Sequence, residues 1–171
     1  KSMSRIVTGS KMCGGLNSSH IGQGVVLNGW VQKRRNLGGL IFCDLRDKTG
    51  IVQIVFNEDV PKELFEQADS LRNEYVVGVS GAVKERQAKN KELATGEIEV
   101  FADDLVIYSR AETPPIYIKD DDEVSENLRM KYRYLDLRKH KMQNNLYFRH
   151  KVTKMTRDFF DSCGFTEIET P

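Results

Sequence analysis

Three features in the first third of the chain could recognise an unpaired nucleic-acid base. Lys33-Arg34-Arg35 supplies positive charge, Phe42 lies in the next apolar run, and Gln53 lies in the one after it. An aromatic ring stacks on a base with about 1–3 kcal/mol, and polar side chains can pair with exposed base edges. A basic run is usually a solvated turn and a single Phe is usually core, so the prediction depends on these residues sharing one face. Together they indicate a surface that binds single-stranded RNA.

The sequence contains no set of residues with the spacing of a catalytic or metal site. Its histidines lie near no Ser, Cys or Asp at triad spacing, and no glycine-rich phosphate loop is present. The three cysteines are far apart and form no Cys-x-x-Cys pair, which excludes a disulfide framework and a zinc site: Cys13, Cys43 and Cys163. We therefore expect no catalytic residue, no metal site and no bound cofactor in this chain.

Composition indicates a globular protein of a reducing compartment. The 171 residues are 39% hydrophobic and 30% charged, and no run approaches the ~18 apolar residues of a membrane helix. We expect a cytoplasmic protein without a membrane partner. The net charge of +1 conceals a basic segment, since residues 24–57 carry five Lys or Arg against two Asp. A local basic patch of this kind can bind phosphates.

Five segments have strand character, two through alternation of apolar and polar residues and the others through apolar, β-favouring residues, which predicts a mainly β domain. A short helix is expected after Pro61, because Leu64, Phe65, Ala68 and Leu71 recur at helical spacing. This order of elements is that of the OB-fold, a five-stranded Greek-key barrel with one short helix that binds oligonucleotides. The predicted strands are Val25–Gln32, Leu40–Leu45, Ile51–Phe56, Glu74–Glu85 and Ile98–Tyr108.

The chain changes character after the fifth predicted strand. Thr113-Pro114-Pro115 and an acidic run predict a linker over residues 109–126, and residues 127–171 have helical character. An apolar stripe in this part ends at Cys163-Gly164, where Gly is the usual C-terminal cap, and it should pack on its own domain or on a dimer mate. The predicted parts are an N-terminal tail or expression remnant (1–12), the barrel (13–108), the linker and residues 127–171.

Several blocks occur in the order found in one known family. The barrel segment resembles the N-terminal anticodon-binding domain of bacterial-type aspartyl-tRNA synthetases. Leu128 to Arg138 resembles the entry to the catalytic domain of these enzymes, and Gly164 to Pro171 resembles motif 1 of class II synthetases. The barrel blocks are Gly29-Trp30-Val31, Arg34-Arg35, Leu37 to Phe42, Asp44-Leu45-Arg46-Asp47, Gly50-Ile51-Val52-Gln53 and Ala94 to Val100.

The resemblance implies a role for individual barrel residues. Phe42 would stack on the central anticodon uracil, with Arg35 and Gln53 holding its edge. Glu99 would read the first anticodon base, and Arg86 would lie near the third. The roles of Phe42, Arg35 and Gln53 agree with the chemistry of their side chains. The role of Glu99 does not follow from its chemistry, because a Glu on a strand is most often solvated.

The resemblance also implies what a full-length protein would do. Members of the family are homodimers that join L-aspartate to tRNA(Asp) with ATP and Mg²⁺, and motif 1 builds the dimer interface, here through Gly164, Phe165 and Pro171. Motifs 2 and 3, which supply the catalytic arginines, are not in the sequence. We therefore expect a fragment that binds the anticodon without catalysing, and that ends in a helix leading into a strand of a truncated class II α+β catalytic domain.

Other interpretations of the sequence stay open at this point. The asparaginyl and lysyl synthetases share the barrel and the class II architecture, and an OB-fold module without catalytic partners could bind single strands regardless of sequence. Within the aspartyl family, the sequence does not decide whether tRNA(Asn) is also a substrate.

Overall fold

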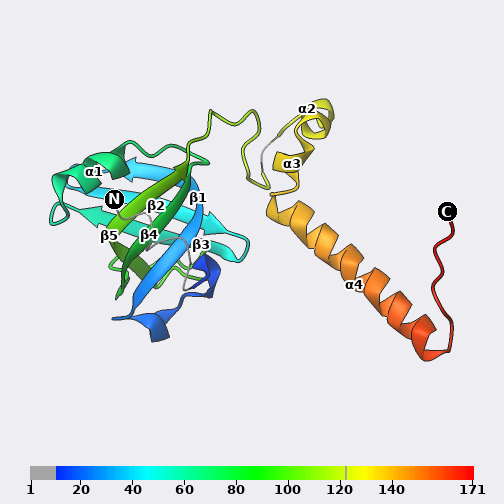
Figure 1. The fold of residues 1–171 in the computed structure, drawn as a ribbon. Helices are drawn as coiled ribbons and strands as arrows, with labels where there is room; N and C mark the ends of the chain where they lie inside the picture. The colour runs from blue at the N-terminus through cyan, green and yellow to red at the C-terminus, as the bar shows by residue number, and fades with distance from the viewer. Residues whose placement is uncertain (1–10, 122) are drawn as a thin grey trace. The chain divides into compact units, whose positions relative to one another are not determined.

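The chain folds as two compact units that divide between Thr113 and Pro114. The computed structural model describes residues 11–121 and 123–171 (Figure 1). The division falls inside the predicted linker, residues 109–126. Most of the predicted tail, residues 1–12, lies outside the described residues.

The first unit is a closed five-stranded barrel, as the sequence predicted. Around the barrel the strands follow the order β1-β2-β3-β5-β4, and β4 pairs with β1 to close it. Neighbouring strands are antiparallel except β3 and β5, which run parallel. This is the topology of the OB-fold. The strands are β1 (Gly24–Asn36), β2 (Leu40–Asp47), β3 (Gly50–Asn57), β4 (Val76–Glu85) and β5 (Ile98–Ser109).

Alternate residues of each strand fill the barrel, because successive side chains of a strand point to opposite faces. On β3 the inward residues are Val52, Ile54 and Phe56, all with no exposed surface. The helix α1 (Lys62–Asp69) adds Leu64 and Ala68 to the same core. Two short 3-10 turns, η1 (Cys13–Gly15) and η2 (Ser18–His20), precede β1.

A β-bulge changes which face the end of β1 presents. Val31 pairs with Leu45 and points inward, but Lys33 pairs with Asp44, so two residues of β1 face one residue of β2. This shift reverses the alternation for the rest of the strand. Arg35 therefore lies opposite Phe42, on the outer face. The strand was predicted to end at Gln32, whereas it continues to Asn36 and carries the basic run on it.

The second unit contains three helices, α2 (Glu126–Lys131), α3 (Arg133–Asp136) and α4 (His140–Ser162). Asp136 has no exposed side-chain surface and accepts a hydrogen bond from Arg129 Nε at 2.9 Å. Arg133 Nη1 also pairs with this carboxylate. These contacts join α2 to α3. None of the described helices is both long and apolar enough to cross a membrane.

The helix α4 ends at the residue that the sequence predicted. Gly164 has φ +83°, its N–H donates to Asp161 O at 2.9 Å, and Phe165 N–H donates to Phe160 O at 3.0 Å. This is a Schellman motif, which usually includes an apolar contact such as the edge-to-face pair of Phe160 and Phe165, with centroids 5.7 Å apart.

The predicted strand after α4 is absent, and α4 itself buries nothing. Residues 165–171 are irregular, because a strand needs a neighbour to accept its hydrogen bonds and none is present in the described part of this unit. No residue of α4 is buried. Its predicted apolar stripe is exposed, with 70% of Phe148 and 63% of Phe159 accessible.

Candidate nucleic-acid interface

A hollow of about 390 Å³ lies on the outer face of the barrel. It is lined by residues from β1, β2, β3 and β5 and from the loop between β4 and β5. All five barrel residues that the resemblance singled out line it, although they span 65 positions of the sequence: Arg35, Phe42, Gln53, Arg86 and Glu99. The remaining lining residues are Leu37, Leu40, Val55, Asn57, Gln87, Ala88 and Phe101.

Phe42 and Arg35 form the side of the hollow nearest the β1–β2 loop. They are direct neighbours across the two strands, and the guanidinium carbon of Arg35 lies 5.7 Å from the centroid of the Phe42 ring. At this distance the cation is attracted by the ring. The Arg35 side chain is 43% exposed and the Phe42 ring is half-buried. Both can therefore reach a ligand without rearrangement of the barrel.

Gln53 and Glu99 form the floor, where they are hydrogen-bonded to each other. Arg35 Nη2 donates to Gln53 Oε1 at 3.3 Å, and Gln53 Nε2 donates to Glu99 Oε2 at 2.9 Å. Gln53 is 4% exposed and Glu99 6% exposed. Unlike most Glu residues on strands, Glu99 is not solvated, because the parallel pairing of β3 with β5 places Gln53 beside it.

Asp44 adds a second carboxylate close to these residues. Its Oδ1 lies 3.9 Å from Arg35 Nη2. Burial raises the pKa of Asp44, and the charges of Arg35, Arg86 and Lys33 partly oppose this rise. The basic residues are thus balanced by Asp44 and Glu99, so the hollow offers both hydrogen-bond donors and acceptors. Such a mixture suits the edge of a base better than a bare phosphate.

Phe101 is a lining residue that the sequence analysis missed. It lies two positions after Glu99 on β5, so the same face of the strand presents both. The Lys84 ammonium lies 3.9 Å from the centroid of the Phe101 ring. The alternation of β5, once Glu99 was singled out, could have identified Phe101. Asp44 could have been found in the same way, two positions after Phe42.

The loop that follows Arg35 is held by α1. Asp69, the last residue of α1, pairs with Arg34 and accepts a hydrogen bond from Asn36 Nδ2 at 2.8 Å. Asn36 Oδ1 in turn accepts from the backbone N–H of Gly38 at 3.0 Å, and Gly38 has φ +82°. Because Arg34 and Asn36 flank Arg35, this cluster orders the strand end that presents the guanidinium.

The side chains that line the hollow are suited to binding a ligand. Its lining contains no Ser, Cys or His that could act as a nucleophile or general base. Within residues 11–121 and 123–171, no group of three or more His, Cys, Asp or Glu side chains is arranged to hold a metal ion. The lining offers two aromatic rings, three side-chain amides, two guanidinium groups and a carboxylate, a set that can stack on a base and pair with its edge.

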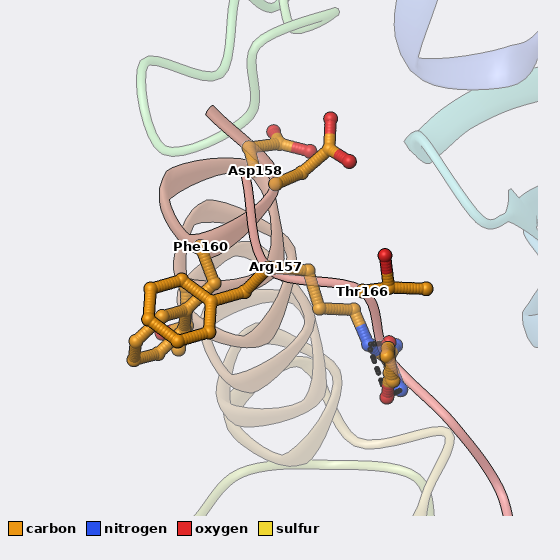
Figure 2. A pocket seen from close by; sticks show the side chains of 8 residues that line it. Arg157, Asp158, Phe160 and Thr166 are labelled. Carbon is orange, nitrogen blue, oxygen red and sulfur yellow. Dashed lines mark hydrogen bonds and ion pairs between the residues drawn. The ribbon is translucent and has the colours of Figure 1, made fainter. Parts of the chain in front are cut away.

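A larger hollow, of about 600 Å³, lies between the end of α4 and the residues that follow it (Figure 2). Figure 2 shows Arg157 reaching from the helix toward this segment, where its Nε lies 2.9 Å from Glu167 Oε2. Phe165 lines this hollow, and Gly164 forms the turn beside it. Pro171, the third residue assigned to motif 1, is exposed at the end of the irregular segment. All these side chains are exposed in the described unit.

Two family profiles match the chain in the positions that the fold suggests. The OB-fold nucleic acid binding domain matches residues 25–108, and the class II tRNA synthetases (D, K and N) match residues 125–171. An aspartate–tRNA ligase of Clostridium botulinum is 53% identical over 160 residues, which cover 94% of this chain and 27% of the relative. The aspartate–tRNA ligase of Listeria monocytogenes is 56% identical over 161 residues, which cover 93% of this chain and 27% of the relative.

Solved structures of synthetases share the fold. Asparaginyl-tRNA synthetase from Pyrococcus horikoshii, complexed with asparaginyl-adenylate, has a TM-score of 0.80 at 30% identity and covers 94% of this chain and 36% of its own. Aspartyl tRNA synthetase from Entamoeba histolytica has a TM-score of 0.82 at 22% identity, and the match covers 90% of this chain and 37% of that one. The chain is similar to aspartate–tRNA ligases over more than nine-tenths of its own length but spans only 27% of theirs, and it combines a match to the OB-fold nucleic acid binding domain with one to the class II tRNA synthetases (D, K and N).

Proposed function

We propose that the hollow on the barrel binds the anticodon of tRNA(Asp). Phe42 stacks on the central uracil, Arg35 and Gln53 pair with its edge, Glu99 contacts the first anticodon base, and Arg86 contacts the third. The loop of a transfer RNA suits this site because its bases can turn outward, where a protein can stack on them and reach their edges.

One observation carries the proposal. Five residues chosen from the sequence, on three strands, a loop and a fourth strand, line the same hollow. They include the ring, the amide and the charged groups that recognition of an unpaired base requires. The similarity of the chain to aspartate–tRNA ligases, together with its match to the OB-fold nucleic acid binding domain, supports the choice of transfer RNA as the ligand.

Binding to two anticodon stem-loops tests this function. The loops carry the tRNA(Asp) anticodon, one with its central uracil and one with that base replaced by adenine. We expect the chain to prefer the uracil loop by at least about tenfold, since a well-formed pair of hydrogen bonds discriminates by ~1–3 kcal/mol. Affinity should fall as salt rises, because phosphate contacts release counterions. Equal affinity for both loops would contradict the reading role.

The full-length protein would then be a cytoplasmic, homodimeric ligase. It would attach L-aspartate to tRNA(Asp) through aspartyl-adenylate, with ATP and Mg²⁺, and Gly164, Phe165 and Pro171 would contribute to the dimer interface. The chain described here lacks motifs 2 and 3, so we expect it to show no aspartate-dependent exchange of pyrophosphate into ATP. Exchange above background would contradict this part of the proposal.

The possibility that the full-length protein is an asparaginyl- or lysyl-tRNA synthetase is less well supported. The curated relatives at 53% and 56% identity are aspartate–tRNA ligases. An OB-fold module that binds single strands regardless of sequence is also disfavoured, because a class II synthetase profile matches residues 125–171. Stem-loops carrying the asparagine and lysine anticodons would separate these possibilities from the aspartate anticodon.

A further inference from the structure

We infer that Glu99 acts through Gln53: its carboxylate fixes the direction of the Gln53 amide, and this direction selects uracil over cytosine at the central anticodon position. The inference rests on the proposed function, since it concerns the base that stacks on Phe42. It makes Glu99 a positioning residue for the central base, in addition to its proposed contact with the first.

The Gln53 amide lies between two opposite charges. Its oxygen accepts from the Arg35 guanidinium at 3.3 Å, and its nitrogen donates to the Glu99 carboxylate at 2.9 Å. Turning the amide by half a revolution would set its NH₂ group against the guanidinium and its oxygen against the carboxylate. Donor would then face donor and acceptor would face acceptor. With Gln53 and Glu99 almost fully buried, water could not replace the lost bonds. The two charges therefore decide which end of the amide is oxygen.

The direction of an amide decides which pyrimidine it can pair with. Uracil offers an acceptor at O4 and a donor at N3, whereas cytosine offers a donor at N4 and an acceptor at N3. One amide can satisfy either pair, but the two pairings require opposite amide directions for a base in the same position. An amide that turns freely would serve both bases. Held in one direction, it serves only one of them.

Gln53 keeps hydrogen-bonding capacity for such a base. Its nitrogen carries a second N–H beyond the one donated to Glu99, and its oxygen has a second lone pair beyond the one used by Arg35. Gln53 lines the same hollow as Phe42. The amide can thus bind the base while the two charges still hold it.

Glu99 is the stronger of the two holding groups. It is almost fully buried and its bond to Gln53 is short, whereas the Arg35 side chain is 43% exposed and its bond is longer. Replacing Glu99 by Gln preserves the size of the side chain but removes the stronger constraint. A second amide can donate or accept, so Gln53 would be satisfied at this contact in either direction, and the longer, more exposed bond to Arg35 would be the remaining constraint.

The test measures binding of two anticodon stem-loops that differ only in the central base, uracil or cytosine, to the 171-residue chain. We expect the wild type to prefer uracil by about tenfold or more, and Glu99→Gln to reduce this preference to within about threefold, mainly by strengthening the cytosine loop. The control is Glu112→Gln, which removes the same charge from an exposed position outside the hollow. It should keep the wild-type preference.

Three results would separate the possible explanations. If Glu99→Gln weakens both loops by the same factor, Glu99 does not direct Gln53 and the inference is wrong. If the wild type itself does not distinguish uracil from cytosine, the result contradicts the proposed function and not the role of Glu99 in particular. In a Gln53→Leu background, Glu99→Gln should leave the uracil-to-cytosine ratio unchanged, and a further change would show that Glu99 contacts the central base directly.

A folding control accompanies these measurements. Far-UV circular dichroism and the urea midpoint should be alike for the wild type and Glu99→Gln. If Glu99→Gln lowers the folded fraction, Glu99→Asp provides the same test, because it retains the charge but shortens the reach toward Gln53. It should shift the uracil-to-cytosine ratio in the same direction, and an unchanged ratio would overturn the inference.

Discussion

The barrel hollow and the hollow at the end of α4 differ in how their side chains are supported. The barrel hollow is smaller, at about 390 Å³ against about 600 Å³, but strands on several sides hold its residues. Gln53 and Glu99 are buried and bonded to each other. At the end of α4, by contrast, Arg157 and Glu167 form a pair whose side chains are 61% and 60% exposed. An exposed pair of this kind contributes little. Fixed geometry, more than volume, distinguishes a binding site from a gap between segments.

The same contrast extends to the apolar residues of the two units. Barrel strands bury one face completely, whereas α4 exposes its apolar stripe along its whole length. A helix with this pattern gains its stability from a surface that covers the stripe. The barrel therefore buries its apolar residues within its own core, whereas the apolar stripe of α4 has no covering surface in the described unit.

The largest expected effect concerns the core of the barrel. Phe56→Ala should lower the free energy of unfolding by about 3–5 kcal/mol, because it empties a fully buried position. Phe159→Ala on α4 is the matched control, and it should change stability by less than about 0.5 kcal/mol. The single tryptophan, Trp30 on β1, allows urea unfolding of the barrel to be followed by fluorescence. Equal losses in the two variants would show that α4 is covered in solution.

The second largest effect is expected on the face of the barrel that carries the hollow. Phe42→Ala should weaken binding of the anticodon stem-loop by about 1–3 kcal/mol, the value of one base stacked on a ring. Phe42→Tyr keeps the ring and should keep most of the affinity. Phe160→Ala, beside the larger hollow, should leave the dissociation constant within about twofold. A comparable loss from Phe160→Ala would mean that RNA also binds the helical unit.

Acid should affect the two units differently. Hydrogen bonds from Arg129 lower the pKa of Asp136, burial opposes this, and the charges of Arg129, Arg133 and Lys139 lower it further. Ionised Asp136 thus adds stability that is complete above its ordinary pKa of 3.8 and is lost as the pH falls through the lowered value. For Asp44 the sign is opposite, since burial raises its pKa and protonation relieves a cost.

Neutral substitutions test these opposite signs. At neutral pH, Asp136→Asn should cost the helical unit about 1–2 kcal/mol, a value reduced by the exposure of its arginine partners. Asp44→Asn should cost the barrel no stability. Amide hydrogen exchange measured from neutral to acidic pH reports each unit separately. If Asp136→Asn left the exchange of α2 and α3 unchanged at neutral pH, the buried carboxylate would not be what joins them.

The smallest effect is expected at the end of α4. Gly164→Ala places a side chain at φ +83° and should cost about 1 kcal/mol of local stability. Faster exchange of the Gly164 and Phe165 N–H groups would reveal it, since both close the Schellman motif. Gly24→Ala, at a position with open space and ordinary backbone, is the control and should be neutral or slightly stabilising.

Local patterns in the sequence were sufficient to predict most of the fold. Alternation and β-favouring residues identified the five strands, and the spacing of Leu64 and Ala68 identified α1. The glycine at position 164 identified the end of α4. These features depend on neighbouring residues alone, so the sequence carries them directly. The site residues Phe42, Arg35 and Gln53 were also found by the chemistry of their side chains.

Features that depend on distant partners were missed. The burial of Glu99 results from pairing between β3 and β5, which are 40 residues apart along the chain. Residues 165–171 were expected to form a strand, but a strand cannot be stable without a neighbour to pair with. The bulge near Lys33 could not be predicted from neighbouring residues, because it is a shift in the pairing of β1 with β2.

That bulge makes the length of β1 matter more than the identity of its residues. Before the bulge, the strand contributes Val25, Leu27 and Val31 to the core; after it, the strand places Arg35 on the outer face, in the lining of the hollow. Deleting one residue at the bulge would restore the uninterrupted alternation and turn the arginine toward the core. Among homologous barrels, substitutions in this strand should therefore be common, whereas one-residue insertions or deletions between Val31 and Arg35 should be nearly absent.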